Sequence, residues 1–117
     1  EDASGHLAIV AVGFKAGQRM NSTLSKIWEA MPLRAGEINF DHQTGINAVF
    51  LLPAERSYLV YEGSLTVPPC TEGVQWFLLT QPVEIAGSYI EKLLRVIGPN
   101  VRAVQPLNDR VVVEVRN

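Results

Sequence analysis

The sequence predicts an α+β fold that is mostly β, and three observations lead to this prediction. Short apolar runs rich in β-branched residues are typical of strands, two stretches carry apolar residues at helical spacing, and strands and helices do not alternate regularly. Regular alternation is typical of a doubly wound parallel sheet, which is therefore disfavoured. The 117 residues, 47% apolar and 19% charged, suffice for one globular domain or one large piece of a domain.

The first element expected is a strand over residues 7–14, which read Leu-Ala-Ile-Val-Ala-Val-Gly-Phe. A continuous apolar run is typical of a strand that is buried on both faces. It carries no charge or proline of the kind that protects an edge strand, so we expect neighbouring strands on both sides. Because this strand begins close to the first residue, the chain reads like the second half of a larger sheet.

A first helix is expected next. Its apolar face has the spacing i, i+3, i+4 and i+7 and consists of Leu24, Ile27, Trp28 and Met31. Asn21 or Ser22 can cap its start, and Pro32 ends it.

A second helix is expected over residues 88–97. Ser88 and Glu91 have the spacing of a capping box, and Gly98-Pro99 ends the helix. Its apolar face consists of Ile90, Leu93, Leu94 and Ile97.

The remaining elements are short. Residues 46–52 are apolar and stop at Pro53, and a strand and a single helical turn are both compatible with them. Other strands are expected at residues 57–61, 74–80 and 111–115, with a turn at 105–110.

Charge and hydropathy exclude several classes of protein. The formal net charge is −2 with both signs interspersed, so no basic stripe predicts nucleic-acid binding. No apolar run approaches the roughly 18–20 residues that cross a bilayer, so no membrane span is expected. No charged segment followed by an apolar one opens the chain, so any export signal was removed or lies outside this sequence.

Few side chains suggest chemistry of their own. Cys70 is the only cysteine, so it is a thiol or half of a bridge to another chain. The candidate metal ligands His6, His42 and Cys70 lack zinc-ligand spacing, so no metal site is expected within this chain. We expect His6 at a strand edge and His42 in a polar turn. Ser64 does not lie in a Gly-x-Ser-x-Gly elbow.

The most informative stretch is residues 61–76, where a proline turn separates two predicted strands. Pro68 and Pro69 fix two backbone φ angles, and an X-Pro bond can be held cis in a tight turn. A threonine held beside such a turn, Thr66, can present both its hydroxyl and its backbone N–H to a ligand. Spacing alone favours a surface threonine in a structural turn.

A family resemblance adds to this interpretation. The stretch is Gly63-Ser64-Leu65-Thr66-Val67-Pro68-Pro69-Cys70-Thr71-Glu72-Gly73-Val74-Gln75-Trp76. It is similar to the α-carbonic anhydrase signature Gly-Ser-Leu-Thr-Thr-Pro-Pro-Cys-Thr-Glu-x-Val-x-Trp. Residues 5–12, 21–32 and 100–110 also resemble segments of that family, with the secreted bacterial members the most similar. The resemblance covers nearly all of the chain.

The resemblance implies the C-terminal half of the family's fold, a large, twisted, mainly antiparallel sheet with peripheral helices. Residues 1–117 would then be the C-terminal part of one carbonic anhydrase domain. The family's three zinc-binding histidines lie upstream of the matched region, so zinc is the implied cofactor but its ligands are absent here. The glutamate that orients the gatekeeper threonine, the proton-shuttle histidine and a partner cysteine are likewise upstream.

The resemblance also implies roles for residues of this chain in carbon dioxide hydration. Zinc lowers the pKa of its bound water to about 7, which gives hydroxide at neutral pH. Thr66 would be the gatekeeper that orients this hydroxide, and its N–H would contact bicarbonate or an inhibitory anion. Ile9, Leu65 and Trp76 would line the apolar substrate pocket. Val67 stands where the family most often has threonine, which removes a hydroxyl near the product.

Cys70 would pair with a cysteine of the missing half, which implies a periplasmic or secreted protein. Sulfonamides are the other inhibitors implied. The favoured hypothesis is an enzyme formed with an N-terminal fragment, this chain alone being inactive. One alternative is a catalytically inactive binding module of the same fold. The other is an isolated truncated fragment that self-associates through an exposed strand edge.

Overall fold

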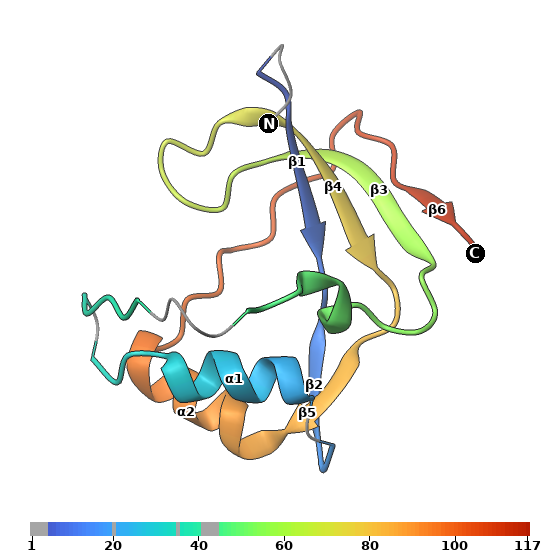
Figure 1. Cartoon of the computed structure of the whole chain (residues 1–117). Helices are drawn as coiled ribbons and strands as arrows, with labels where there is room; N and C mark the ends of the chain where they lie inside the picture. The colour runs from blue at the N-terminus through green and yellow to red at the C-terminus, as the bar shows by residue number, and fades with distance from the viewer. Residues whose placement is uncertain (1–4, 20, 35, 41–44) are drawn as a thin grey trace. The chain divides into compact units, whose positions relative to one another are not determined.

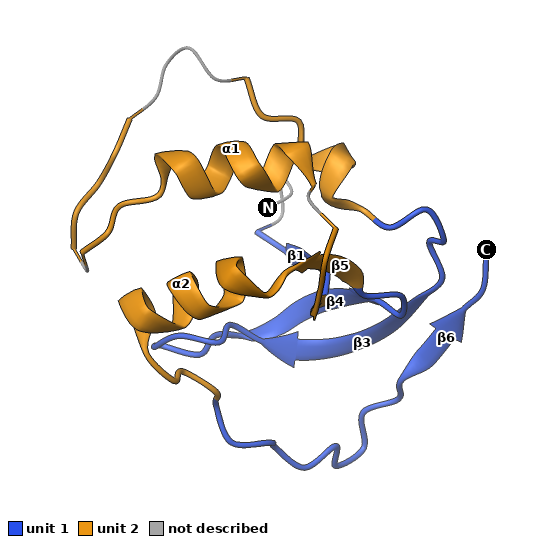
Figure 2. Ribbon diagram, turned by 90° about the horizontal axis from the view of Figure 1, so that it is seen from below, with its two compact units in different colours: residues 1–13, 53–82, 102–117 blue, residues 14–52, 83–101 orange. Residues whose placement is uncertain are grey.

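The computed structural model describes residues 5–19, 21–34, 36–40 and 45–117. Figure 1 shows the elements in chain order: β1 (Leu7–Ala11), β2 (Phe14–Gly17), α1 (Ser22–Ala30), η1 (Ala48–Leu51), β3 (Tyr58–Ser64), β4 (Glu72–Leu79), β5 (Val83–Ala86), α2 (Gly87–Ile97) and β6 (Val113–Val115). The chain divides into two compact units (Figure 2). Unit 1 comprises residues 1–13, 53–82 and 102–117, and unit 2 comprises residues 14–52 and 83–101.

Unit 1 is built on a four-stranded sheet in the order β1-β4-β3-β6. β3 pairs antiparallel with both β4 and β6, whereas β1 pairs parallel with β4. Val74 of β4 is fully buried, and Leu79 at the end of β4 is 8% exposed. Apolar side chains on the central strand therefore anchor the strands on either side of it.

The predicted strand at residues 7–14 is divided in two. β1 ends at Ala11, and Phe14 begins β2, which joins a different sheet. Burial alternates along β1, and Val10 is 60% exposed, so the prediction of burial on both faces was wrong. β1 also lies at an edge of the sheet that the described residues form, so the expected second neighbour is not within them.

Unit 2 packs helices against a two-stranded parallel sheet of β2 and β5. Its core is a cluster of the buried residues Leu24, Trp28 and Ile85, with half-buried apolar side chains around it. The Trp28 indole N–H donates to the carbonyl oxygen of Tyr89 at 3.0 Å, and the two rings lie 5.3 Å apart. One hydrogen bond and one ring contact thus orient the Trp28 side chain in this core.

The first helix follows its sequence signals. The Asn21 side chain accepts hydrogen bonds from the backbone N–H groups of Thr23 and Leu24, so Asn21 is the N-cap. Of the two cap candidates, Ser22 is instead the first helical residue. The helix ends at Ala30, two residues before Pro32.

The second helix begins one residue earlier than predicted. Its N-cap is Ala86, which makes no side-chain capping bond, so the predicted capping box of Ser88 and Glu91 was wrong. The helix starts directly from β5, and this leaves no turn for a serine cap. Its predicted end is confirmed, because Gly98 adopts φ 67° and its N–H bonds to the Leu94 carbonyl oxygen at 2.9 Å.

The short elements resolve the open alternatives. Residues 46–52 contain the 3₁₀ turn η1 and no strand, so the helical alternative holds. The strands predicted at 57–61, 74–80 and 111–115 correspond to β3, β4 and β6, although β6 begins only at Val113. β5 was not predicted.

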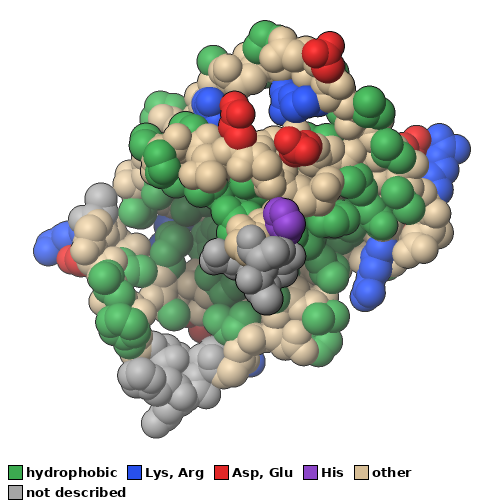
Figure 3. All heavy atoms as spheres, turned by 90° about the horizontal axis from the view of Figure 1, so that it is seen from above, with side chains coloured by type: hydrophobic (Ala, Val, Ile, Leu, Met, Phe, Trp, Pro, Cys, Tyr) green, Lys and Arg blue, Asp and Glu red, His purple; other side chains and the backbone are tan. Residues whose placement is uncertain are grey.

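Large apolar side chains remain exposed on both units. Val104 of unit 1 is 97% exposed and Phe50 of unit 2 is 65% exposed, and hydrophobic side chains are visible on the face in Figure 3. No helix in the described part of the chain is both long and apolar enough to span a membrane.

Candidate active site at the Thr66 loop

The candidate site begins where β3 runs into the proline turn. Residues 65–71 form a loop that two backbone hydrogen bonds close, from the Leu65 N–H to the Thr71 oxygen and from the Cys70 N–H to the Val67 oxygen, both 2.9 Å. The Pro68–Pro69 peptide bond is cis, the alternative that the sequence left open for a tight turn. The loop thus has a defined path, with Thr66 exposed near its start.

A row of side chains crosses the sheet beside this loop. Trp76 of β4 is the register partner of Ile9 on β1 and of Tyr61 on β3. Register partners on neighbouring strands lie on one face of a sheet, so the three side chains share a face. The rings of Tyr61 and Trp76 stack at 6.2 Å with an interplanar angle of 7°.

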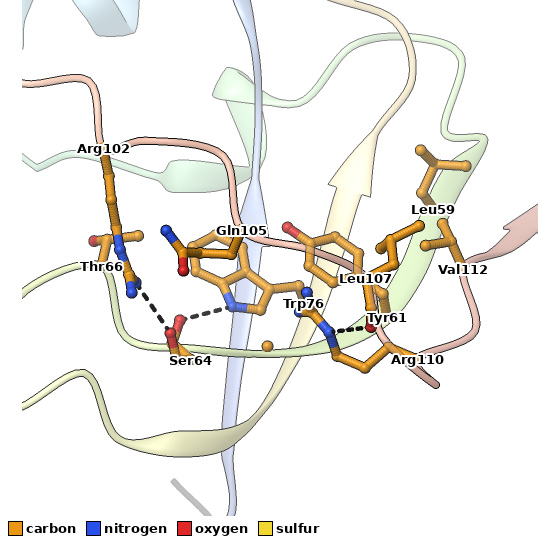
Figure 4. A pocket seen from close by; sticks show the side chains of 11 residues that line it. Leu59, Tyr61, Ser64, Thr66, Trp76, Arg102, Gln105, Leu107, Arg110 and Val112 are labelled. Carbon is orange, nitrogen blue, oxygen red and sulfur yellow. Dashed lines mark hydrogen bonds between the residues drawn. The ribbon is translucent and has the colours of Figure 1, made fainter.

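Thr66 and Trp76 line one cavity of about 520 Å³ in unit 1 (Figure 4). Its walls combine stacked aromatic rings, aliphatic side chains and two guanidinium groups. The lining residues are Leu59, Tyr61, Gly63, Ser64, Thr66, Trp76, Arg102, Gln105, Leu107, Arg110 and Val112. These described lining residues include two arginines and no acidic side chain, so the cavity can receive a small apolar molecule or an anion.

Two arginines fix the segment 102–112 against β3. Arg110 donates to the carbonyl oxygens of Leu107 at 3.0 Å, Pro106 at 2.6 Å and Glu62 at 3.1 Å. All of these acceptors are backbone atoms, so Arg110 holds the turn at residues 106–110 onto the strand.

The second arginine, Arg102, reaches the loop itself. Its Nη1 donates to the Ser64 hydroxyl at 3.3 Å and to the Leu65 carbonyl oxygen at 3.5 Å. The Ser64 hydroxyl donates in turn to the Leu65 carbonyl oxygen at 3.0 Å, and Figure 4 shows Arg102 and Trp76 meeting at Ser64. The Ser64 hydroxyl therefore serves the loop's own hydrogen bonds.

The predicted site residues are only partly brought together. Thr66 and Trp76 line the cavity, and Ile9 shares the face of Trp76 without lining it. Leu65 is half-buried and Val67 is 62% exposed, and neither lines the cavity. Their roles towards substrate therefore stay predictions.

The cysteine and histidines give no metal centre here. Cys70 is a half-buried free thiol, and His6 is exposed directly before β1. His42 lies outside the described residues. Among residues 5–19, 21–34, 36–40 and 45–117, no three His, Cys, Asp or Glu side chains gather as a metal site, so these residues do not fit a zinc ion.

Sequence reasoning missed most of the cavity wall. Tyr61, Arg102 and Arg110 were not predicted as site residues. For Tyr61, the alternation along β3 and the register with Trp76 would have placed both side chains on one face. For the arginines no periodic pattern exists, because they lie in a segment without helix or strand, and the family resemblance of residues 100–110 was the signal that could have singled them out.

Comparison with known proteins identifies the class to which this fold and loop belong. The family model for eukaryotic-type carbonic anhydrase matches residues 1–116. The chain is 44% identical over 107 residues to a carbonic anhydrase of Neisseria gonorrhoeae, covering 91% of this chain and 41% of that protein. It is 40% identical over 111 residues to a carbonic anhydrase of Nostoc, covering 95% and 42%.

Comparison with solved structures points to the same family. The α-carbonic anhydrase of Thermovibrio ammonificans, in complex with the inhibitor sulfanilamide, superposes with a TM-score of 0.87 at 42% identity, covering 95% of this chain and 49% of that one. The chain belongs to the α-carbonic anhydrase family, and its predicted fold class is confirmed. It spans less than half the length of these curated relatives.

Proposed function

We propose that this chain forms part of a zinc-dependent carbonic anhydrase, a lyase that interconverts carbon dioxide and bicarbonate. The observation that carries the proposal is the family match over residues 1–116, within which the Thr66 loop borders an apolar cavity bearing guanidinium groups. Carbon dioxide is small and uncharged, whereas bicarbonate is an anion, and such a cavity suits both.

In this proposal the chain positions the substrate and the attacking oxygen, and it does not bind the metal. The Thr66 hydroxyl orients the attacking oxygen, and the Thr66 N–H binds bicarbonate or an inhibitory anion. Trp76 lines the cavity already, and Ile9 and Leu65, which do not line it in this chain, complete the apolar wall for carbon dioxide in the assembled enzyme. Val67 leaves one hydrogen-bonding group fewer beside the product.

Zinc and its ligands would come from an N-terminal fragment of the same enzyme. Three observations support a polypeptide partner. The chain spans less than half of its curated relatives, β1 has a free edge within the described sheet, and Val10 on β1 is 60% exposed. An apolar edge strand is a template for pairing with another strand.

The proposed role of Cys70 also bears on the cellular compartment in which the enzyme works. A disulfide between Cys70 and the N-terminal fragment would join the two pieces in an oxidising environment, so we propose a periplasmic or secreted enzyme. Because the Thermovibrio relative was solved with sulfanilamide, we also propose that sulfonamides inhibit the assembled enzyme.

Native mass spectrometry of the purified protein, repeated after denaturation and reduction, is the test of this assembly. A zinc-containing complex heavier than 12.9 kDa that separates into this chain and a second piece would support the proposal. A species of 12.9 kDa or its homodimer, free of zinc, would overturn it in favour of a self-associating fragment. A two-piece complex without zinc or hydration activity would indicate the inactive binding module.

The role of Thr66 is tested in the active complex. Thr66→Ala is expected to lower carbon dioxide hydration strongly while the zinc content stays unchanged, because the fold and the metal ligands are untouched. Unchanged hydration would reject the gatekeeper role. The chain purified alone is expected to be inactive, and zinc-dependent activity of the isolated chain would contradict the proposed division of the site.

A further inference from the structure

Thr66 is joined to Leu65 by a single peptide group, and the orientation of that group decides where the Thr66 N–H points. The peptide is planar and trans, so the Leu65 C=O and the Thr66 N–H point in opposite directions from one plane. Whatever holds the Leu65 carbonyl oxygen therefore aims the Thr66 N–H.

Side chains hold this oxygen from two directions. The Ser64 hydroxyl donates to it at 3.0 Å and Arg102 Nη1 at 3.5 Å. Arg102 Nη1 also donates to the Ser64 hydroxyl at 3.3 Å, which sets the direction of the serine's own hydrogen bond. The Ser64 carbonyl is held separately by the Trp76 indole N–H at 3.1 Å.

We propose that Arg102 is a positioning residue that aims the Thr66 N–H by holding the Leu65 carbonyl and the Ser64 hydroxyl. The inference deepens the proposed function and rests on it, since it assigns a purpose to that N–H as the donor to bicarbonate. Arg102 itself need not touch substrate. Its charge also draws electron density along the Leu65–Thr66 peptide and makes the N–H a stronger donor.

The chemistry of arginine suits this task. A guanidinium stays protonated throughout the working pH range and presents several N–H groups in a rigid plane, so it can serve two neighbouring acceptors at once. Lysine keeps the charge without the planar fork. Glutamine keeps a hydrogen-bond donor without the charge. The two substitutions therefore separate geometry from charge.

The first arm of the test uses the chain itself, labelled with ¹³C and ¹⁵N. Arg102→Gln is expected to shift both the Leu65 carbonyl ¹³C and the Thr66 amide ¹⁵N resonances, which report the two ends of one peptide. Arg95→Gln is the matched control, because Arg95 lies on an exposed part of α2 and pairs with Glu91 at 3.4 Å, far along the chain from the Leu65–Thr66 peptide. Unchanged Leu65 and Thr66 resonances in Arg102→Gln would overturn the proposal.

Folding is checked in the same spectra. The indole N–H signals of Trp28 and Trp76 report unit 2 and unit 1 separately, since each has a defined acceptor. If Arg102→Gln disturbs both signals, Arg102→Lys replaces it, with the same two resonances as readout. Movement of these resonances in a folded variant supports the proposal.

The second arm uses the assembled enzyme. Loss of a charged hydrogen bond that orients a donor is expected to lower kcat/KM for bicarbonate dehydration roughly tenfold in Arg102→Gln. The fall should lie mainly in the KM for bicarbonate, Arg102→Lys should recover part of it, and the pH profile should keep its shape. A loss confined to kcat, or a displaced pH profile, would overturn the positioning role.

The two arms separate the inference from the proposed function. An assembled wild-type protein without hydration activity would overturn the proposed function and the catalytic purpose of the N–H. The resonances of the Leu65–Thr66 peptide would still decide whether Arg102 holds it. Full wild-type activity together with unaltered bicarbonate kinetics in Arg102→Gln would overturn the inference alone.

Discussion

Replacing Gly63 by alanine is expected to disturb the candidate site through one side chain, the Trp76 indole. A Cβ at position 63 would lie 2.8 Å from Cδ1 and 3.0 Å from Nε1 of Trp76, closer than carbon atoms approach without displacement. The ring is rigid, so the whole indole must move. Its hydrogen bond to the Ser64 carbonyl and its stacking on Tyr61 would both be weakened.

The expected cost follows from these contacts. An off-rotamer side chain costs about 1 kcal/mol and a lost hydrogen bond about 1 kcal/mol, so unit 1 should lose roughly 2 kcal/mol of stability. With a urea m-value of about 1–2 kcal/mol per M for a small unit, the unfolding midpoint should fall by roughly 1–2 M.

The assay is a urea titration followed by the two indole N–H resonances. The Trp76 signal should shift in Gly63→Ala and disappear at lower urea, while the Trp28 signal should keep its position in the absence of urea. Gly45→Ala is the control, since nothing lies within 4 Å of the added Cβ there. An unshifted Trp76 signal with an unchanged midpoint would refute the close approach of Gly63 to the Trp76 ring.

Three further predictions concern single interactions. Asn21→Ala should destabilise unit 2 by about 1 kcal/mol, because two N–H groups of α1 lose their acceptor, and circular dichroism during urea unfolding measures this. An unchanged midpoint would argue against the cap. Ile85 is 1% exposed, so Ile85→Val should lower the free energy of unfolding of unit 2 by about 1 kcal/mol and Ile85→Ala by about 3 kcal/mol in the same titration. Similar losses for both would contradict its close packing. The hydrogen bond from Arg116 and then its positive charge lower the pKa of the Glu114 carboxyl. Any stability from this pair is present above the carboxyl's ordinary pKa and is lost as the pH falls through the lowered value. NMR titration should show the Glu114 pKa rising in Arg116→Gln, and an unmoved pKa would contradict the pairing.

Features that depend on nearby residues were predictable from the sequence. The spacing of Leu24 and Trp28 and the position of Asn21 determine α1, since a helix face and its cap are set within one or two turns. Gly98 ended α2 as expected, because few other residues adopt a positive φ easily. The turn around Pro68 and Pro69 was identified for the same kind of reason.

Features that depend on distant partners were not predictable in the same way. Residues 7–14 read as one strand, yet Ala11 pairs with Leu78 in one sheet and Phe14 with Val83 in the other. Burial of β1 was overestimated because an apolar sequence does not reveal whether its neighbours are present.

In the candidate site too, local features were predictable from the sequence and contacts between distant residues were not. The Thr66 loop was evident from its own residues, whereas Arg102 acts across 37 residues of sequence on the Leu65 carbonyl. No periodic pattern in the sequence predicts such a long-range contact. The family resemblance supplied roles for Ile9, Leu65 and Val67, and these remain predictions.

The interleaved order of unit 1 has a consequence for synthesis on the ribosome. Its sheet joins β1 to β3, β4 and β6, which all follow β1 along the chain and are separated from it by residues of unit 2. β1 must therefore wait, unpaired with β4, until residues 14–52 of unit 2 and then β3 have been translated between them. An apolar strand that is synthesised well before its pairing partner is exposed to aggregation and to chaperone binding, and slower translation would lengthen that exposure.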